Sequence, residues 1–226
     1  DHIDAHFQLS QVYDATGDLE KSLSEFERVI EIQPRNLEGH YRKGDIYQRL
    51  GDDKAAAKSF EEALIIDSDH TLSNYQLGLS YIKMDRHEDA LEKFEKAIES
   101  DSRFPEAYFQ MGSILAYLKR FKKAIDPLKK ATNLKPDFSQ AYYELGNAYS
   151  HLNQYQKAIE PLEQVIRINN LHADAYLALG LAHSKLKQYD PSIIHLRKAL
   201  DLNPSHTKAY FPLGLSLMKV GRFEDA

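Results

Sequence analysis

Ten histidines are the side chains of this sequence that most invite a search for catalytic or metal-binding chemistry. His2 and His6 are four residues apart, a spacing that places both imidazoles on one face of a helix. No further ligand follows at the spacing of a known zinc site, so the pair predicts no metal centre. His183 stands where other parts of the chain carry tyrosine or leucine, which indicates a flat ring packed in a core. The histidines therefore predict structural or solvent-exposed roles.

The short motifs that carry hydrolytic or phosphate chemistry are missing from the sequence. It contains no HExxH helix, no glycine-rich phosphate loop after a strand and no G-x-S-x-G elbow. Because it contains no cysteine, thiol catalysis, disulfides and zinc–cysteine sites are excluded. We therefore expect no catalytic residues, no metal and no cofactor, and a protein that is not an enzyme.

Charge is distributed unevenly along the chain, although 29 basic and 34 acidic residues give a net charge of only −5. Residues 1–104 carry 23 acidic and 13 basic side chains, whereas residues 105–226 carry 11 acidic and 16 basic ones. Six basic residues form a cluster: Lys119, Arg120, Lys122, Lys123, Lys129 and Lys130. We interpret this cluster as a solvated outer surface, with docking of an acidic partner as the alternative. The negative total charge argues against nucleic acid as a partner.

The composition is that of a folded chain, with 42% hydrophobic and 28% charged residues among 226. No apolar run approaches the roughly 18 residues of a membrane span, so we expect no membrane insertion. The absence of cysteine suits a cytoplasmic location and is compatible with a periplasmic one. The opening residues Asp1 and His2 belong to neither a signal peptide nor a natural start, so we expect a piece of a longer protein.

A period of 34 residues runs through the sequence without insertion or deletion. Numbering positions 1 to 34 in each repeat, position 8 is Ser10, Gly44, Gly78, Gly112, Gly146, Gly180 and Gly214. Position 20 is small, at Ser22, Ala56, Ala90, Ala124, Ala158, Ser192 and Ala226. Position 24 is bulky, at Phe26, Phe60, Phe94, Leu128, Leu162 and Leu196. The period predicts six complete repeats and a truncated seventh.

Each repeat contains two helical periodicities separated by a turn. Turn-forming residues at position 15 are Gly17, Gly51, Asp85, Asn153 and Gly221, and proline or a capping residue at position 32 separates most repeats. A glycine inside a helix costs about 1 kcal/mol relative to alanine. The glycines at position 8 therefore predict close contact between the two helices of a repeat, with the small residue at position 20 as the partner.

The pattern of Gly at 8, Tyr at 11, Ala at 20, Phe at 24, Ala at 27 and Pro at 32 resembles the tetratricopeptide repeat, over residues 3–226. The resemblance implies an all-α fold, a right-handed solenoid superhelix of antiparallel helix pairs whose first helices line a concave groove. We expect a single solenoid domain over residues 1–226, with repeats at 3–36, 37–70, 71–104, 105–138, 139–172, 173–206 and, in part, 207–226.

The groove is the candidate functional site, because apolar side chains that would otherwise face water usually mark a partner surface. The candidate partner-binding residues are Tyr41, Tyr75, Leu79, Ile82, Phe109, Tyr143, Asn147, Leu177 and Leu181. For the side chains at position 5, packing between repeats is the alternative explanation. The two-carboxylate clamp of chaperone-tail binders in this family requires a lysine at position 5, which no repeat has. A terminal Glu-Glu-Val-Asp ligand is therefore not expected.

These observations predict a non-enzymatic protein–protein interaction scaffold that binds an extended or helical segment of a partner. Two alternatives stay open: a self-assembling, homo-oligomeric scaffold, and a targeting or substrate-binding module of a larger enzyme such as a glycosyltransferase. Solenoids normally cover their terminal apolar face with a polar helix, and none follows the first helix of the seventh repeat. We expect Tyr210, Leu213 and Leu217 to be exposed there and to serve self-association.

Overall fold

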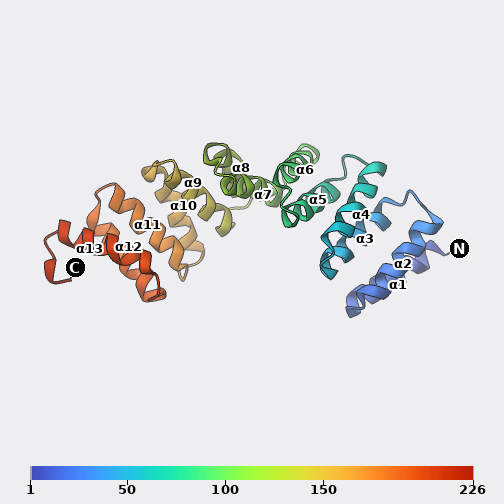
Figure 1. Ribbon diagram of the computed structural model, residues 1–226, viewed down its shortest axis with the longest axis horizontal. Helices are drawn as coiled ribbons and strands as arrows, with labels where there is room; N and C mark the ends of the chain where they lie inside the picture. The colour runs from blue at the N-terminus through green and yellow to red at the C-terminus, as the bar shows by residue number, and fades with distance from the viewer. Residues whose placement is uncertain (1, 226) are drawn as a thin grey trace. The chain divides into compact units, whose positions relative to one another are not determined.

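The computed structural model describes residues 2–225, which form helices and no β-strand (Figure 1). The first helices of the repeats are α1 (Ile3–Thr16), α3 (Leu37–Leu50), α5 (Thr71–Lys83), α7 (Pro105–Tyr117), α9 (Ser139–His151), α11 (Ala173–Lys185) and α13 (Thr207–Lys219). The second helices are α2 (Leu19–Ile32), α4 (Asp53–Ile66), α6 (His87–Ser100), α8 (Phe121–Leu134), α10 (Tyr155–Ile168) and α12 (Tyr189–Leu202). A 3-10 turn, η1 (Phe223–Asp225), follows α13. The prediction of an all-α repeat solenoid is confirmed; Asp1 and Ala226 lie outside the described residues.

The chain forms two compact units, residues 1–107 and residues 108–226, called unit 1 and unit 2 below. In unit 1, each helix from α1 to α6 packs against the next helix along the chain. In unit 2, the helices from α8 to α13 pack in the same consecutive way. The boundary falls inside α7, so most of that helix belongs to unit 2.

The turn between the two helices of each repeat is made by a residue with positive φ. Three of these residues are glycine, at Gly17, Gly51 and Gly221, and four are not, at Asp85, Lys119, Asn153 and Lys187. The next N–H donates to the carbonyl five residues earlier, as in Gln188 N–H to His183 O at 2.9 Å, which is a common helix C-cap. Sequence reasoning missed Lys119 and Lys187 as turn residues because lysine has no preference for the left-handed region.

We predict that Lys187→Gly stabilises unit 2 by about 0.5–1 kcal/mol. Glycine removes the Cβ clash of the left-handed backbone, which costs about 1–2 kcal/mol, and loses part of this gain through its more flexible unfolded state. The midpoint of urea unfolding measures the effect. As a control, Lys198→Gly inside α12 should lower the midpoint by about 1 kcal/mol. A lower midpoint for Lys187→Gly would contradict the prediction.

The glycines at position 8 make room for the bulky side chain at position 24 of the same repeat. A Cβ added to Gly146 would lie 2.6 Å from Cγ of Leu162, and one on Gly44 would lie 2.5 Å from Cε1 of Phe60. The expected partner, the small residue at position 20, is therefore not the nearest group. Residues such as Ala158 are fully buried and allow the helices to approach, while the longer side chain one turn later reaches across to the glycine.

We predict that Gly146→Ala destabilises unit 2 by about 1–3 kcal/mol, because the added methyl overpacks against Leu162. Helix propensity alone predicts the opposite sign, a gain of about 1 kcal/mol. Urea unfolding distinguishes the two, and Gly146→Leu should have a larger effect than alanine. Shortening the opposing side chain in a Gly146→Ala/Leu162→Ala double variant should give less than the sum of the two single losses. A Gly146→Ala midpoint equal to or above that of the wild type would rule out the packing explanation.

Position 4 carries a polar side chain that reaches back to the loop before its helix. Nε2 of His40 lies 2.9 Å from Pro34 O, Nδ2 of Asn74 donates to Ser68 O at 2.9 Å, and the Tyr210 hydroxyl donates to Pro204 O at 3.0 Å. In each case the acceptor is the carbonyl six residues earlier. Three chemically different side chains thus make the same contact between a helix and the loop that precedes it.

The C-terminal helix α13 is covered more than the sequence predicted. Leu217 is only 1% exposed, and Leu213 is half-buried against a cluster that includes Leu196 and Ala209. Of the three residues expected on a bare face, only Tyr210 is exposed. The expectation for Leu217 fails because α13 packs on α12 and η1 contacts α13. The exposed apolar side chains of α13 are instead Phe211, Leu215 and Met218, at 81%, 39% and 54%.

Candidate functional site

Several residues expected to form a free binding surface are buried or half-buried. Tyr41 and Leu177 are each only 8% exposed, and Tyr75, Leu79 and Ile82 are half-buried. The side chains at position 5 meet the residue 29 positions later, which precedes the next first helix. The ring centroids are 5.5 Å apart for Tyr41 and His70, 4.7 Å for Tyr75 and Phe104, 4.8 Å for Phe109 and Phe138, and 5.0 Å for Tyr143 and His172. The packing alternative therefore explains much of the aromatic stripe.

Two arginines on α3 in unit 1 are paired with carboxylates of first helices. The Arg49 guanidinium contacts the Asp14 carboxylate and lies 3.8 Å from Oδ2 of Asp45, and Arg42 donates to Glu38 at 2.6 Å. Burial raises the pKa of the Asp45 carboxyl, while the nearby arginines act in the opposite direction. Both arginines therefore already have carboxylate partners within unit 1.

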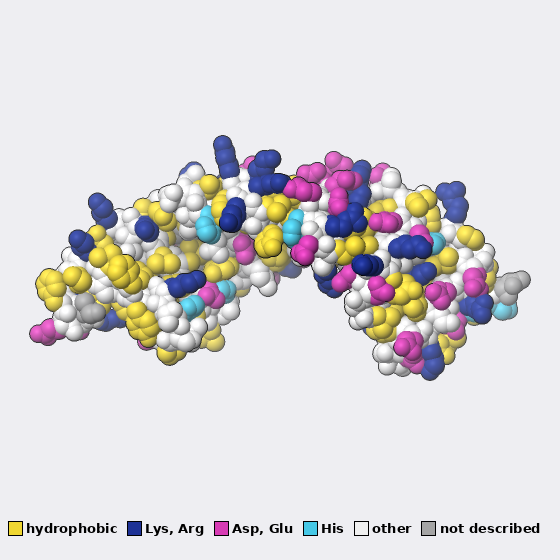
Figure 2. Space-filling view, in the orientation of Figure 1, with side chains coloured by type: hydrophobic (Ala, Val, Ile, Leu, Met, Phe, Trp, Pro, Cys, Tyr) yellow, Lys and Arg dark blue, Asp and Glu magenta, His cyan; other side chains and the backbone are white. Residues whose placement is uncertain are grey.

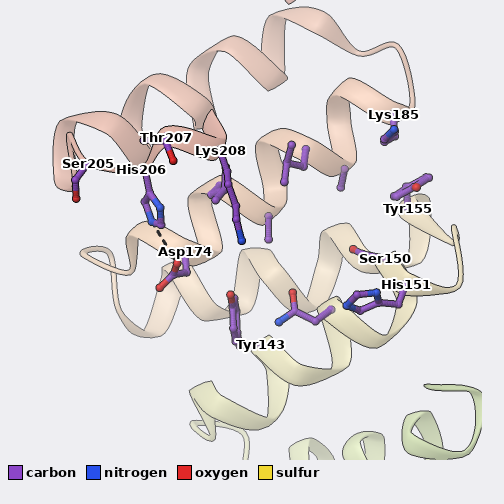
Figure 3. A pocket seen from close by; sticks show the side chains of 15 residues that line it. Tyr143, Ser150, His151, Tyr155, Asp174, Lys185, Ser205, His206, Thr207 and Lys208 are labelled. Atoms are coloured by element: carbon purple, nitrogen blue, oxygen red, sulfur yellow. Dashed lines mark ion pairs between the residues drawn. The ribbon is translucent and has the colours of Figure 1, made fainter. Parts of the chain in front are cut away.

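Unit 2 contains a pocket of about 600 Å³ between α9, α11 and α13, called the α9–α13 groove below (Figure 3). It brings together four of the predicted site residues: Tyr143, Asn147, Leu177 and Leu181. The other lining residues are Ser150, His151, Tyr155, Asp174, Ala178, Ala182, Lys185, Ser205, His206, Thr207 and Lys208. The remaining predicted residues, Tyr41, Tyr75, Leu79, Ile82 and Phe109, lie outside this groove.

The α9–α13 groove has an apolar floor from one helix and a polar rim from its neighbours. Leu177, Ala178 and Leu181, on α11, form the floor, and the Leu181 side chain is half-buried. Burial raises the pKa of the Tyr143 phenol, a hydrogen bond with Asn147 lowers it, and the Asp174 carboxylate raises it. The phenol therefore stays neutral at physiological pH and can donate or accept a hydrogen bond.

Three charged side chains line the groove, Asp174, Lys185 and Lys208, and Asp174 lies beside a histidine. Nε2 of His206 lies 3.2 Å from Oδ1 of Asp174 (Figure 3). Lys185 and Lys208 are exposed, and neither has an ion-pair partner within residues 2–225. The groove thus has two unpaired ammonium groups beside an apolar surface.

Sequence reasoning missed Lys185, His206 and Lys208, because they lie at repeat positions 13, 34 and 2, outside the columns expected to face the groove. One signal was available in the sequence. Position 2 is acidic in four repeats, at Asp4, Glu38, Glu106 and Asp174, and only the seventh repeat has a base there, Lys208. A reversal of charge in one column indicates a local function more directly than the aromatic stripe does.

The other residues singled out in the sequence have structural surroundings. Nδ1 of His6 lies 2.6 Å from Glu25 Oε2, and His183 is buried, with Nδ1 2.7 Å from Gln188 Oε1 and its ring stacked on His195. The basic cluster projects from the surface around α8, as Figure 2 shows, and its side chains are exposed. Within residues 2–225 no three metal-ligating side chains come together, and no helix is long and apolar enough to cross a bilayer.

Three similar solved structures each cover 73% or more of this chain. YrrB, described as a TPR protein with an unusual peptide-binding site, has a TM-score of 0.77 at 22% identity over 82% of this chain and 96% of that chain. MamA has a TM-score of 0.68 at 30% identity, over 73% of this chain and 96% of that chain. The pilF protein of Pseudomonas aeruginosa has a TM-score of 0.72 at 18% identity, over 96% and 97%. YrrB and pilF, below 25% identity, support the fold alone.

Comparison with family models gives matches along the sequence. Tetratricopeptide repeat models match residues 3–36, 37–70, 72–104, 139–170 and 173–206, and a TPR repeat model matches residues 112–152. A search of curated proteins gives no match. Since these models cover most of the sequence and the helix pairs have the corresponding architecture, the chain belongs to the tetratricopeptide repeat family.

Proposed function

We propose that this chain is a non-enzymatic interaction scaffold whose α9–α13 groove binds an extended or helical segment of a partner protein. The tetratricopeptide fold generally mediates protein–protein interaction. The observation that carries the proposal is the groove of about 600 Å³, with Leu177 and Leu181 in its floor and free polar groups around it. An apolar surface with a few polar groups at its edge is typical of peptide and ligand sites.

The serine, histidine and carboxylate that line the groove are not arranged as a catalytic triad. The Ser150 hydroxyl donates to Gly146 O at 2.9 Å, so its proton is held by the backbone of its own helix. The His151 ring stacks on Phe121 with centroids 4.3 Å apart, and Asp174 faces His206. Nucleophilic catalysis needs a base in contact with the nucleophile and a third group that orients the base. This geometry supports binding rather than hydrolysis.

Leu181 and Leu79 occupy the same repeat position in the two units and provide a matched pair of variants. Both are half-buried on a first helix, but only Leu181 lies in the α9–α13 groove. The candidate residues Tyr75, Leu79 and Ile82 of unit 1 are not part of the proposed site in the groove. Comparing the two leucine variants distinguishes the loss of a peptide contact in the groove from a general loss of helix packing.

We predict that Leu181→Ala weakens peptide binding about tenfold or more, because an apolar anchor in an interface is worth about 1–2 kcal/mol. The probes are peptides selected from a displayed random library on the wild-type protein, and their affinities are measured by fluorescence anisotropy. Leu79→Ala should leave these affinities unchanged, and circular dichroism should show both variants folded. Selection of no peptide above an empty-matrix control, or equal binding by wild type and Leu181→Ala, would refute the groove as the site.

Self-association through α13 is a second candidate function, because one exposed ring favours it. Phe211 is 81% exposed, and Met218 on the same helix is 54% exposed. Exposed apolar clusters of this kind commonly meet another molecule.

We predict that the wild-type chain shows a concentration-dependent mass in sedimentation velocity and that Phe211→Ser/Met218→Ser abolishes it. Removing the two side chains takes away the apolar contact area without touching the buried face of α13. Ile194→Ser, which removes an exposed apolar side chain from α12, serves as the control and should associate like the wild type. A wild-type mass that stays monomeric across the dilution series would refute self-association.

A further inference from the structure

We infer that the α9–α13 groove selects an acidic segment, in which two carboxylate side chains flank an apolar residue. The inference rests on groove binding as proposed above and specifies the chemistry of the ligand. It starts from two cations, Lys185 and Lys208, that the described part of the chain leaves without a carboxylate partner.

The two lysines lie at opposite ends of the apolar floor. In Figure 3, Lys208 extends from α13 towards Tyr143 and Asp174, while Lys185 lies beside Tyr155 at the far end of α11. Asp174 and Lys185 are close to the two ends of α11, Ala173–Lys185. At ~1.5 Å per helical residue they are about 16 Å apart along the axis. The two ammonium groups therefore form separate sites with Leu177 and Leu181 between them.

This separation predicts the spacing of the acidic residues in the ligand. An extended chain advances roughly 3.3 Å per residue and places every second side chain on the same face, so a span of about 16 Å between Asp174 and Lys185 corresponds best to carboxylates about four positions apart. One apolar side chain between them would lie over Leu177 and Leu181. A single terminal carboxylate pairs with one ammonium only, so two acidic side chains within a chain satisfy the groove better than a free C-terminus does.

The carboxylate already in the groove does not neutralise these lysines. Asp174 is the only acidic residue that lines it, and its Oδ1 lies 3.2 Å from the His206 ring. The wider surroundings favour the same ligand, because residues 105–226 carry 16 basic and 11 acidic side chains. A positive field attracts acidic segments and raises their association rate. In unit 1, by contrast, Arg42 and Arg49 already pair with carboxylates of their own unit.

Three synthetic peptides test the ligand chemistry, each acetylated and amidated so that no terminal charge remains. All carry one central leucine, with two glutamates, two glutamines or two lysines placed two positions before and two positions after it, so that the three side chains share one face of an extended chain. Fluorescence anisotropy should show the glutamate peptide binding about tenfold tighter than the glutamine peptide, and the lysine peptide weaker than both. Added salt should reduce the difference, because it screens exposed charges. A fourth peptide, with glutamines and a free C-terminal carboxylate, tests the terminal source.

Charge variants test whether these groove residues contact the peptide. Removing a lysine and removing Asp174 should change the affinity for the glutamate peptide in opposite directions. Lys185→Gln and Lys208→Gln should each weaken the glutamate peptide severalfold without changing the glutamine peptide. Asp174→Asn should strengthen the glutamate peptide, because it removes the one opposing charge. Lys198→Gln on α12, which does not line the groove, is the matched control and should change nothing.

The outcomes separate this inference from the proposed function. If all peptides bind alike and Leu181→Ala weakens each of them, the groove binds peptides and the acidic preference is wrong. If the peptide with a free C-terminus binds best, two internal carboxylates are not what the groove selects. If no peptide distinguishes wild type from Leu181→Ala, the proposed function fails with the inference. A weaker glutamate peptide on Asp174→Asn would also overturn the assignment.

Discussion

The helix pairs depend on one contact: in five first helices (α3, α5, α7, α9 and α11) a glycine in the middle of the helix packs against the bulky side chain sixteen residues later. It lets Phe60, Phe94, Leu128, Leu162 and Leu196 reach their complete burial. Because the two helices lie this close together, the small residues at position 20 are buried in their interface. Each helix pair then presents a defined surface to the next pair. The groove in unit 2 is a consequence, because its walls are first helices whose spacing the helix pairs determine.

The sequence pattern was sufficient for the fold but only partly for the site. A regular period of 34 residues with glycine and proline in fixed columns identifies helix pairs, because each column has one local cause. Leu177 lies in the same column as Tyr143, yet it is buried where Tyr143 is half-exposed, since Leu177 belongs to a cluster with Ala209 of the next repeat. We expected Leu217 to be exposed for the same reason: the residues that bury its side chain belong to other helices. Contacts across repeats are tertiary, and periodicity within one repeat does not report them.

The two units share the same helix-pair architecture but differ in the charge of their surfaces. In unit 1 the arginines on the first helices are held by Asp14, Glu38 and Asp45, and the exposed surface is acidic around α6 (Figure 2). In unit 2 the lysines at the groove stand apart from carboxylates, and the outer surface of α8 is basic. The buried columns are nearly the same in both units, so the difference lies in side chains that do not contribute to the core.

The bond from position 4 to the preceding loop alters the meaning of the departures from the family pattern in the early repeats. His40 and Asn74 stand where later repeats have tyrosine. Compared by residue identity alone, the early repeats would therefore look divergent from the family pattern. By geometry the two side chains are equivalent donors, since each reaches the same carbonyl as Tyr210. Repeats of this kind are better compared by the contact that a side chain makes than by residue identity, and by that criterion the second and third repeats match the seventh.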